Sequence, residues 1–131
     1  MLKVLPIQTK EQQKSTAEKC GTPFIPDALA YEATIDGKIA GICQFRVTAD
    51  GGIIYDLAPA LDLNDFESMF IMGRGTLNFI DLCGVHRARF VGEIKDVALL
   101  HAVGFKENDE GILEINLEGF FEDHCHNHKK D

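Results

Sequence analysis

Apolar residues recur at helical spacing in the second half of the chain. They stand three, four and seven positions apart, which is the spacing of one helical face, at Phe66, Met69, Phe70, Leu77 and Ile80. Asn64 or Asp65 can cap the start of this helix, and Gly84 stands where a left-handed C-terminal cap is expected. The two glycines of Gly73-Arg74-Gly75 each cost a helix interior about 1 kcal/mol against alanine. The pattern predicts a long helix that tolerates both glycines, and the alternative is a helix that begins only after Gly75.

Shorter apolar runs before this helix predict strands. The runs 30–35, 39–48 and 53–57 are separated by Asp-Gly-Lys at 36–38 and Asp-Gly-Gly at 50–52. Because Asp-Gly between apolar runs is typical of a hairpin turn, the three runs predict an antiparallel meander. Lys3 to Gln8 is a short edge strand, and a polar helix at the surface follows it, starting at Thr9 and ending at Gly21.

The chain after the long helix returns to the sheet. Residues 88–91 predict a strand that runs parallel to 53–57, because a helical crossover joins the two. Asp96 caps a short helix over 97–103, and a last hairpin follows it up to Leu117. We therefore expect one α+β domain over residues 1–119, with a mixed, mostly antiparallel sheet flanked by helices, and a C-terminal tail over 120–131.

Composition narrows the function classes. The chain has 131 residues and a net charge of −8, and no apolar run approaches the roughly 20 residues that span a bilayer. Its basic residues are scattered, so we expect neither nucleic-acid nor membrane partners, and we expect a cytoplasmic protein. The four cysteines form no C-x-x-C pair and are interpreted as free thiols, those at 43 and 83 as small core residues.

The tail contains three histidines and one cysteine. His124, Cys125, His126 and His128 are ligand types that suit zinc or nickel. Because they stand at the chain end, where side chains are usually solvated, we assign no metal site to them.

The order of these elements resembles the GNAT superfamily of acyl-CoA-dependent N-acyltransferases. Three stretches carry the resemblance: the hairpin 35–41, Leu57-Ala58-Pro59 at the end of the fourth strand, and the short helix that ends in Gly104-Phe105. The resemblance implies a GNAT-like fold with a central V where strands four and five part. It also implies acetyl-CoA as co-substrate in that V and an amine acceptor, small or on a protein. The oligomeric state is left open, with a homodimer as one option.

The resemblance implies site residues on the positions that match. The backbone at Leu57 and Ala58 would hold the pantetheine arm. Gly73, Arg74 and Gly75 form the one Gly-x-Gly sequence available to bind the pyrophosphate. The loop expected at that place, 62–67, has no glycine and three carboxylates. Like charges 4 Å apart repel by about 4 kcal/mol at an effective dielectric of 20, so the phosphate site is displaced or lost.

The catalytic candidates are Tyr55 and Asp56 on strand four and His101 on the short helix. The family often has a tyrosine as general acid four residues before Gly-Phe, and here Leu100 stands at that position. The alternatives are structural: a half-buried tyrosine, a surface carboxylate and a solvated histidine. Two functions follow: an N-acyltransferase acting on an amine, or a GNAT-like domain that has lost catalysis and binds a ligand or another protein.

Overall fold

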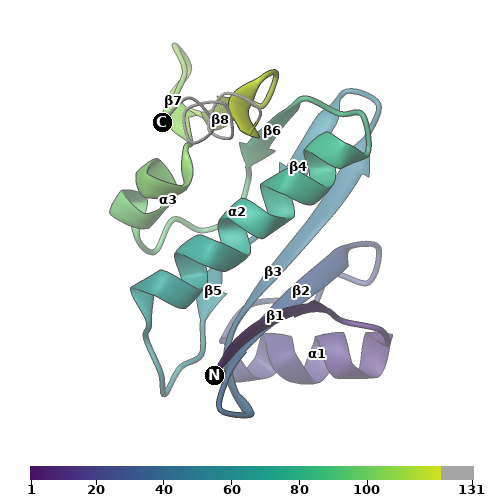
Figure 1. Ribbon diagram of the computed structural model, residues 1–131, viewed down its shortest axis with the longest axis vertical. Coiled ribbons are helices and arrows are strands. Elements are labelled where there is room, and N and C mark those ends of the chain that lie inside the picture. The colour runs from purple at the N-terminus through teal and green to yellow at the C-terminus, as the bar shows by residue number, and fades with distance from the viewer. Residues whose placement is uncertain (122–131) are drawn as a thin grey trace, which may run out of the picture.

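The computed structural model describes residues 1–121 as an eight-stranded sheet with helices on both faces (Figure 1). The strands are β1 Leu2–Pro6, β2 Leu29–Ile35, β3 Lys38–Thr48, β4 Gly51–Ile54, β5 Ala58–Pro59, β6 Arg87–Phe90, β7 Lys106–Glu107 and β8 Leu113–Asn116. The helices are α1 Lys10–Lys19, α2 Phe66–Leu82 and α3 Val97–Val103. The predicted α+β class is confirmed.

The sheet is mixed in the way that the sequence predicts. Its strand order is β1-β2-β3-β4-β6-β8-β7, and β5 pairs with β3 off this path. Only β4 and β6 are parallel among the described strands, with Ile53 beside Arg89, whereas the other pairs are antiparallel. Asp36 and Gly37 have φ of 51° and 83°, the left-handed turn that joins β2 to β3.

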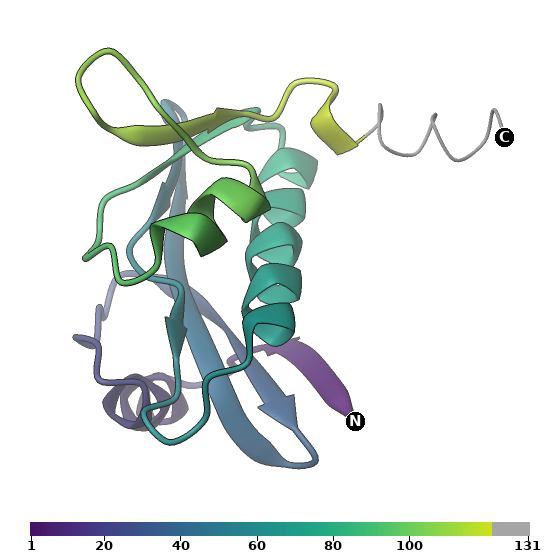
Figure 2. The ribbon, with the colours of Figure 1, turned by 90° about the vertical axis from the view of Figure 1, so that its left-hand side faces the viewer.

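The two faces of the sheet are covered differently (Figure 2). α2 lies along one face, and its buried side chains include Met69, Met72, Leu77 and Ile80. α1 lies on the opposite face and was expected at the surface because it has few apolar residues. Gln13 and Thr16 are nevertheless buried, since their polar groups find partners in the sheet layer and the loop after α1.

The long helix contains both glycines. Asp65 caps α2, and its side chain accepts a hydrogen bond from Ser68 N at 3.0 Å. A Cβ at Gly73 would lie 3.0 Å from Val103 and 3.1 Å from Leu57, so this glycine allows α2 to approach α3 and the sheet closely. The alternative that the helix begins after Gly75 is wrong.

Details at the C-terminal end differ from the predictions. The last hairpin is shorter than expected, because only Lys106–Glu107 and Leu113–Asn116 pair. Phe120 and Phe121 were assigned to the tail, but both pack against the hydrophobic core. Cys43 is buried as expected, whereas Cys83 is exposed. Cys125 and the tail histidines lie outside the described residues.

Candidate functional site

A bulge opens the sheet between β4 and β6. Ile54 pairs with Phe45 and Ala58 pairs with Ile42, so three residues on one strand, 55–57, lie opposite two on β3. One extra residue bends a strand and re-aims its side chains. The last hydrogen bond between the two strands is donated by Val91 N to Ile54 O at 2.9 Å. Beyond it, the chain after β6 turns toward α3, while β5 remains paired with β3. The two parallel strands therefore part, as the V predicted between strands four and five requires.

Glycine at position 92 sits at the point where the strands part. A Cβ added to Gly92 would lie 1.8 Å from Tyr55 O, which is closer than any real contact. Only glycine lets the two backbones touch there before they diverge.

Two cavities flank the opening. One, of about 270 Å³, is lined from the α1–β2 loop, the bulge and the segment after β6 by Thr22, Pro23, Ile25, Tyr55, Asp56, Leu57, Ala58, Gly92, Glu93 and Lys95. The other, of about 160 Å³, adjoins the start of α2 and the inner face of α3 and includes Phe66, Met69, Leu99 and Leu100. We call them the loop-side cavity and the helix-side cavity. Leu57, Glu93 and Lys95 line both, so the cavities meet at the V.

Asp56 is the buried carboxylate of the loop-side cavity, with 5% of its surface exposed. Its Oδ1 accepts from Gln44 N at 2.7 Å, and its Oδ2 accepts from Gln44 Nε2 at 2.7 Å and from Thr22 Oγ1 at 3.2 Å. A carboxylate offers about four lone-pair sites, so three hydrogen bonds leave it able to accept one more. The interpretation of Asp56 as a surface carboxylate is wrong.

Gln44 holds this carboxylate and the cavity wall together. Its Oε1 accepts from Ile25 N at 2.9 Å and its Nε2 donates to Pro23 O at 2.8 Å, so two backbone groups fix the orientation of the amide. Gln13 Nε2 donates to the same Oε1 at 2.9 Å from α1. The described part of the chain leaves no buried side-chain polar atom without a partner, so this network is fully satisfied.

Burial raises the pKa of Asp56 from 3.8 to about 6, while hydrogen bonds from Gln44 and Thr22 and the charge of Lys95 oppose the rise. A carboxylate in this range is largely ionised at neutral pH and can still take a proton during a reaction. The buried thiols behave differently, because burial raises the pKa of Cys20 to about 12 and raises that of Cys43 as well. Neither thiol is an activated nucleophile.

The structure brings together some of the predicted site residues. Simple alternation would send Tyr55 and Asp56 to opposite faces, but the bulge brings both to the loop-side cavity. Leu57 and Ala58 also line it, at the strand edge that β6 leaves. His101 lies elsewhere: it is exposed, its Nε2 lies 2.8 Å from Glu107 Oε1, and it lines neither cavity. α3 turns Leu100, not His101, toward the V, so His101 does not lie with the other predicted site residues.

The residues proposed for phosphate contacts have other partners. Gly73, Arg74 and Gly75 lie inside α2, where backbone amides are used in helical hydrogen bonds, so they present no phosphate loop. Arg74 Nε donates to Val103 O at 2.7 Å, and the guanidinium lies over the rings of Phe70 and Phe120. This arginine therefore caps the C-terminal end of α3. The assignment of these three residues to cofactor binding is not supported.

The start of α2 itself carries a carboxylate. Asp65 occupies the cap position, and Asp62 pairs with Lys38 at 3.2 Å. A pyrophosphate placed at this helix end would meet the charge of Asp65 instead of free amides. The start of α2 therefore has no glycine-rich cradle for a diphosphate.

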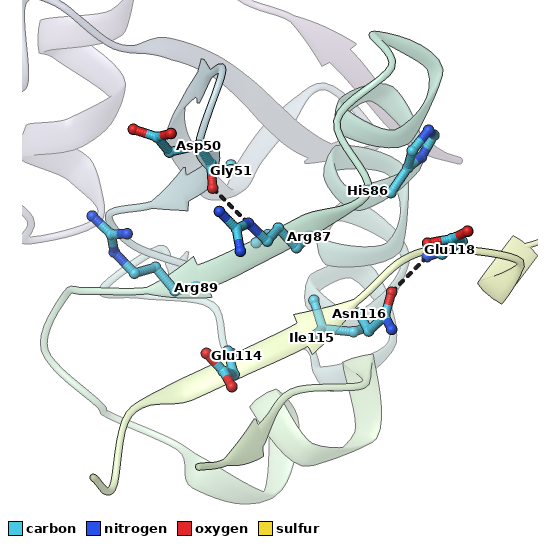
Figure 3. Close-up of a pocket in the computed structure, with 11 residues that line it drawn as sticks. Asp50, Gly51, His86, Arg87, Arg89, Glu114, Ile115, Asn116 and Glu118 are labelled. Carbon is cyan, nitrogen blue, oxygen red and sulfur yellow. Dashed lines mark hydrogen bonds between the residues drawn. The ribbon is translucent and has the colours of Figure 1, made fainter. Parts of the chain in front are cut away.

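A third cavity of about 600 Å³, the largest of the three, lies on the sheet at the starts of β4 and β6 (Figure 3). Arg87, Arg89, Glu114 and Glu118 line it, and Arg87 Nε donates to Asp50 O at 2.6 Å. Arg87 and Arg89 alternate with the buried Ala88 and Phe90, so they project from the face opposite α2. They do not lie beside the start of α2 and cannot replace the missing phosphate loop.

Sequence reasoning missed several residues of the loop-side cavity. Gln44 lies inside a strand among apolar neighbours. An amide at such a position is expected to be buried and therefore to need a hydrogen-bond partner, and this was the one signal in the sequence that pointed to it. Thr22 and Lys95 lie in loops, where nothing in the pattern indicates which groups they face.

Neither metal binding nor membrane insertion is indicated in the part of the chain that the structure describes. Residues 1–121 hold no group of three potential metal ligands. No helix among them has the length and apolar character needed to cross a bilayer.

Comparisons with known proteins agree with this geometry. No protein-family model matches the chain, and no curated protein matches it. Solved structures do match. An IAA acetyltransferase from Bacillus cereus is 15% identical, with a TM-score of 0.71 over 89% of this chain and 100% of that chain.

Two further structures match over similar lengths. The ribosomal-protein-S18-alanine N-acetyltransferase of Escherichia coli is 15% identical, with a TM-score of 0.69 over 89% of this chain and 94% of that chain. The PaiA N-acetyltransferase of Thermoplasma acidophilum, solved in complex with coenzyme A, is 13% identical, with a TM-score of 0.67 over 88% and 99%. At these identities the likeness concerns the fold. The chain has the fold of the GNAT N-acetyltransferases.

Proposed function

We propose that the protein is an acyl-CoA-dependent N-acyltransferase that transfers an acetyl group to an amine. The observation behind the proposal is the V, which has a buried, hydrogen-bonded carboxylate on one side and a mainly apolar cavity on the other. The solved neighbours named above are acetyltransferases, and one was solved with coenzyme A. Their fold supports the reaction class and leaves the acceptor open.

The geometry supports a direct transfer. In the described part of the chain β5 pairs only with β3, so its other edge is open to hydrogen bonds from a pantetheine arm. The helix-side cavity takes the acyl end, and the amine enters through the loop-side cavity. Its nitrogen forms the new C–N bond, the C–S bond breaks with its electron pair on sulfur, and Asp56 takes the amine proton.

The leaving thiolate takes its proton from solvent. Leu100 stands where a tyrosine is often found in the family that the sequence resembles, and a leucine side chain has no proton to give. We therefore expect a slower enzyme than one with a positioned acid, since a general acid contributes about 10²–10⁴-fold.

The alternative is a domain that has lost catalysis and binds a ligand or a protein. The carboxylate of Asp65 at the start of α2 and the leucine at position 100 favour it.

The test is amine-dependent release of CoA thiol from acetyl-CoA, measured with a panel of amines for the wild type and Asp56→Asn. The acyltransferase releases thiol only when an amine is present, and the substitution abolishes most of this release. A protein that binds acetyl-CoA but never forms N-acetyl product supports the alternative instead.

A further inference from the structure

The loop-side cavity contains charges of both signs. Asp56 lies at its buried end, whereas Glu93 and Lys95 are exposed in the segment between β6 and α3. The side chain of Lys95 makes no hydrogen bond and no ion pair with the described residues. Its ammonium is therefore available to a ligand that also reaches Asp56.

The arrangement matches an amine that carries a carboxylate. We propose, resting on the acyltransferase function above, that the acceptor is a small free α-amino acid whose amine meets Asp56 and whose carboxylate meets Lys95. The carboxylate at the buried end and the ammonium near the V provide opposite charges for the two groups of one such molecule. Charge-assisted hydrogen bonds of this kind are about twice as strong as neutral ones.

The size of the cavity supports a small acceptor. Its volume of about 270 Å³ lies below the roughly 300–1,000 Å³ typical of drug-sized ligands. Pro23, Ile25, Leu57 and Ala58 supply apolar wall, which suits a short aliphatic side chain. A peptide N-terminus would place a neutral amide, not a carboxylate, beside Lys95.

The experiment compares matched acceptors. Each of a series of small L-amino acids is assayed with acetyl-CoA beside its amide and its decarboxylated amine, and N-acetyl product is measured. We expect kcat/KM at least about tenfold higher for an amino acid than for its amide, which corresponds to about 1.4 kcal/mol. Lys95→Met should lower this ratio about tenfold, mainly through KM, and Lys95→Arg should retain most of it. Lys106→Met, an exposed lysine outside the cavity, is the matched control.

Different outcomes identify different errors. Equal use of amide and amino acid, preference for peptide N-termini, or an unchanged ratio in Lys95→Met would overturn the amino-acid acceptor while leaving the acyltransferase intact. The absence of N-acetyl product with every amine would overturn the proposed function and, with it, this inference. Thermal unfolding with millimolar amino acid and no acetyl-CoA adds a readout without catalysis, and the proposal expects an upward shift that Lys95→Met removes.

Discussion

At the scale of single residues, the central group is the buried carboxylate of Asp56. Its pKa is raised to about 6, so the side chain is protonated below that pH and cannot accept a proton. The profile of kcat/KM should therefore contain a break near pH 6, separate from the titration of the amine itself, and this break should be absent in Asp56→Asn. Asp56→Asn removes the base and should lower kcat/KM about 10²–10⁴-fold. A flat profile between pH 5 and 8, or an active Asp56→Asn variant, would contradict the role of this residue.

Other ionisable groups lie around Asp56. The charge of Lys95 after β6 lowers its pKa, and Cys20 after α1 and Cys43 on β3 are coupled to it. Glu93 and Tyr55 line the same cavity. Both thiols stay protonated over the range of the measurement because burial raises their pKa. The break in the profile should therefore belong to Asp56, and Lys95→Met should move it to higher pH, since the lysine charge lowers the pKa.

A second residue-scale prediction concerns Gln44. Gln44→Leu leaves Ile25 N, Pro23 O and Asp56 without their side-chain partner, and each buried unsatisfied group costs about 1–3 kcal/mol. We expect urea denaturation to show a loss of about 3 kcal/mol or more, and the break in the pH profile to move upward. Gln12→Leu makes the same change at an exposed position of α1 and should have little effect on the free energy of unfolding. Equal free energies of unfolding for the two variants would show that the hydrogen bonds of Gln44 do not stabilise the protein.

At the scale of elements, the meeting of β4 and β6 depends on glycine. A Cβ at position 92 would overlap Tyr55 O, and a backbone atom cannot rotate away. We expect Gly92→Ala to destabilise the protein by about 1–3 kcal/mol, as overpacking does, and to weaken binding in the V. Gly75→Ala is the matched control, because nothing lies within 4 Å of its added Cβ. Inside α2 this change should stabilise by about 1 kcal/mol. Thermal unfolding of both variants measures these effects. An unchanged unfolding midpoint in Gly92→Ala would contradict the close contact between the backbones at Gly92 and Tyr55.

The start of α2 yields a prediction about charge. Asn caps helices about as well as Asp, so Asp65→Asn should leave the free energy of unfolding nearly unchanged. It removes a negative charge near the expected pyrophosphate, so affinity for acetyl-CoA should rise several-fold, and more at low salt. S-acetylpantetheine has no diphosphate, and its affinity should not change. Calorimetric titration of both ligands makes the comparison. An equal gain for both would show that charge repulsion is not the cause.

At the scale of the whole molecule, the helices and strands were predictable from signals between neighbouring residues. Contacts between residues far apart in the sequence were not predictable. The caps at Thr9, Asp65 and Asp96 were visible because each lies within three residues of the amide that it accepts from. The bulge could not be read from the chain, because it is a difference in length between two paired strands. For the same reason the partners of Gln44, which lie up to 31 positions away, were missed.

Part of the candidate site was predictable from the sequence. Tyr55, Asp56, Leu57 and Ala58 line one cavity together, and the sequence pointed to this group because the resemblance fixed the end of strand four. His101 was not separable from Leu100 by sequence, since one position along a helix turns a side chain by about 100°. The acidic loop before α2 was visible from composition alone, and the structure adds that Asp65 occupies the helix end.

Binding of acyl-CoA in the V is the first requirement of the proposed function. The most direct measurement is thermal unfolding of the purified protein with and without millimolar acetyl-CoA, CoA and S-acetylpantetheine. A ligand at 100 times its Kd stabilises by about 2.7 kcal/mol, roughly several degrees for a chain of this size. We predict an upward shift of the unfolding midpoint with acetyl-CoA that Gly92→Ala reduces. An unchanged midpoint at millimolar concentrations of all three ligands would show that the V does not bind acyl-CoA.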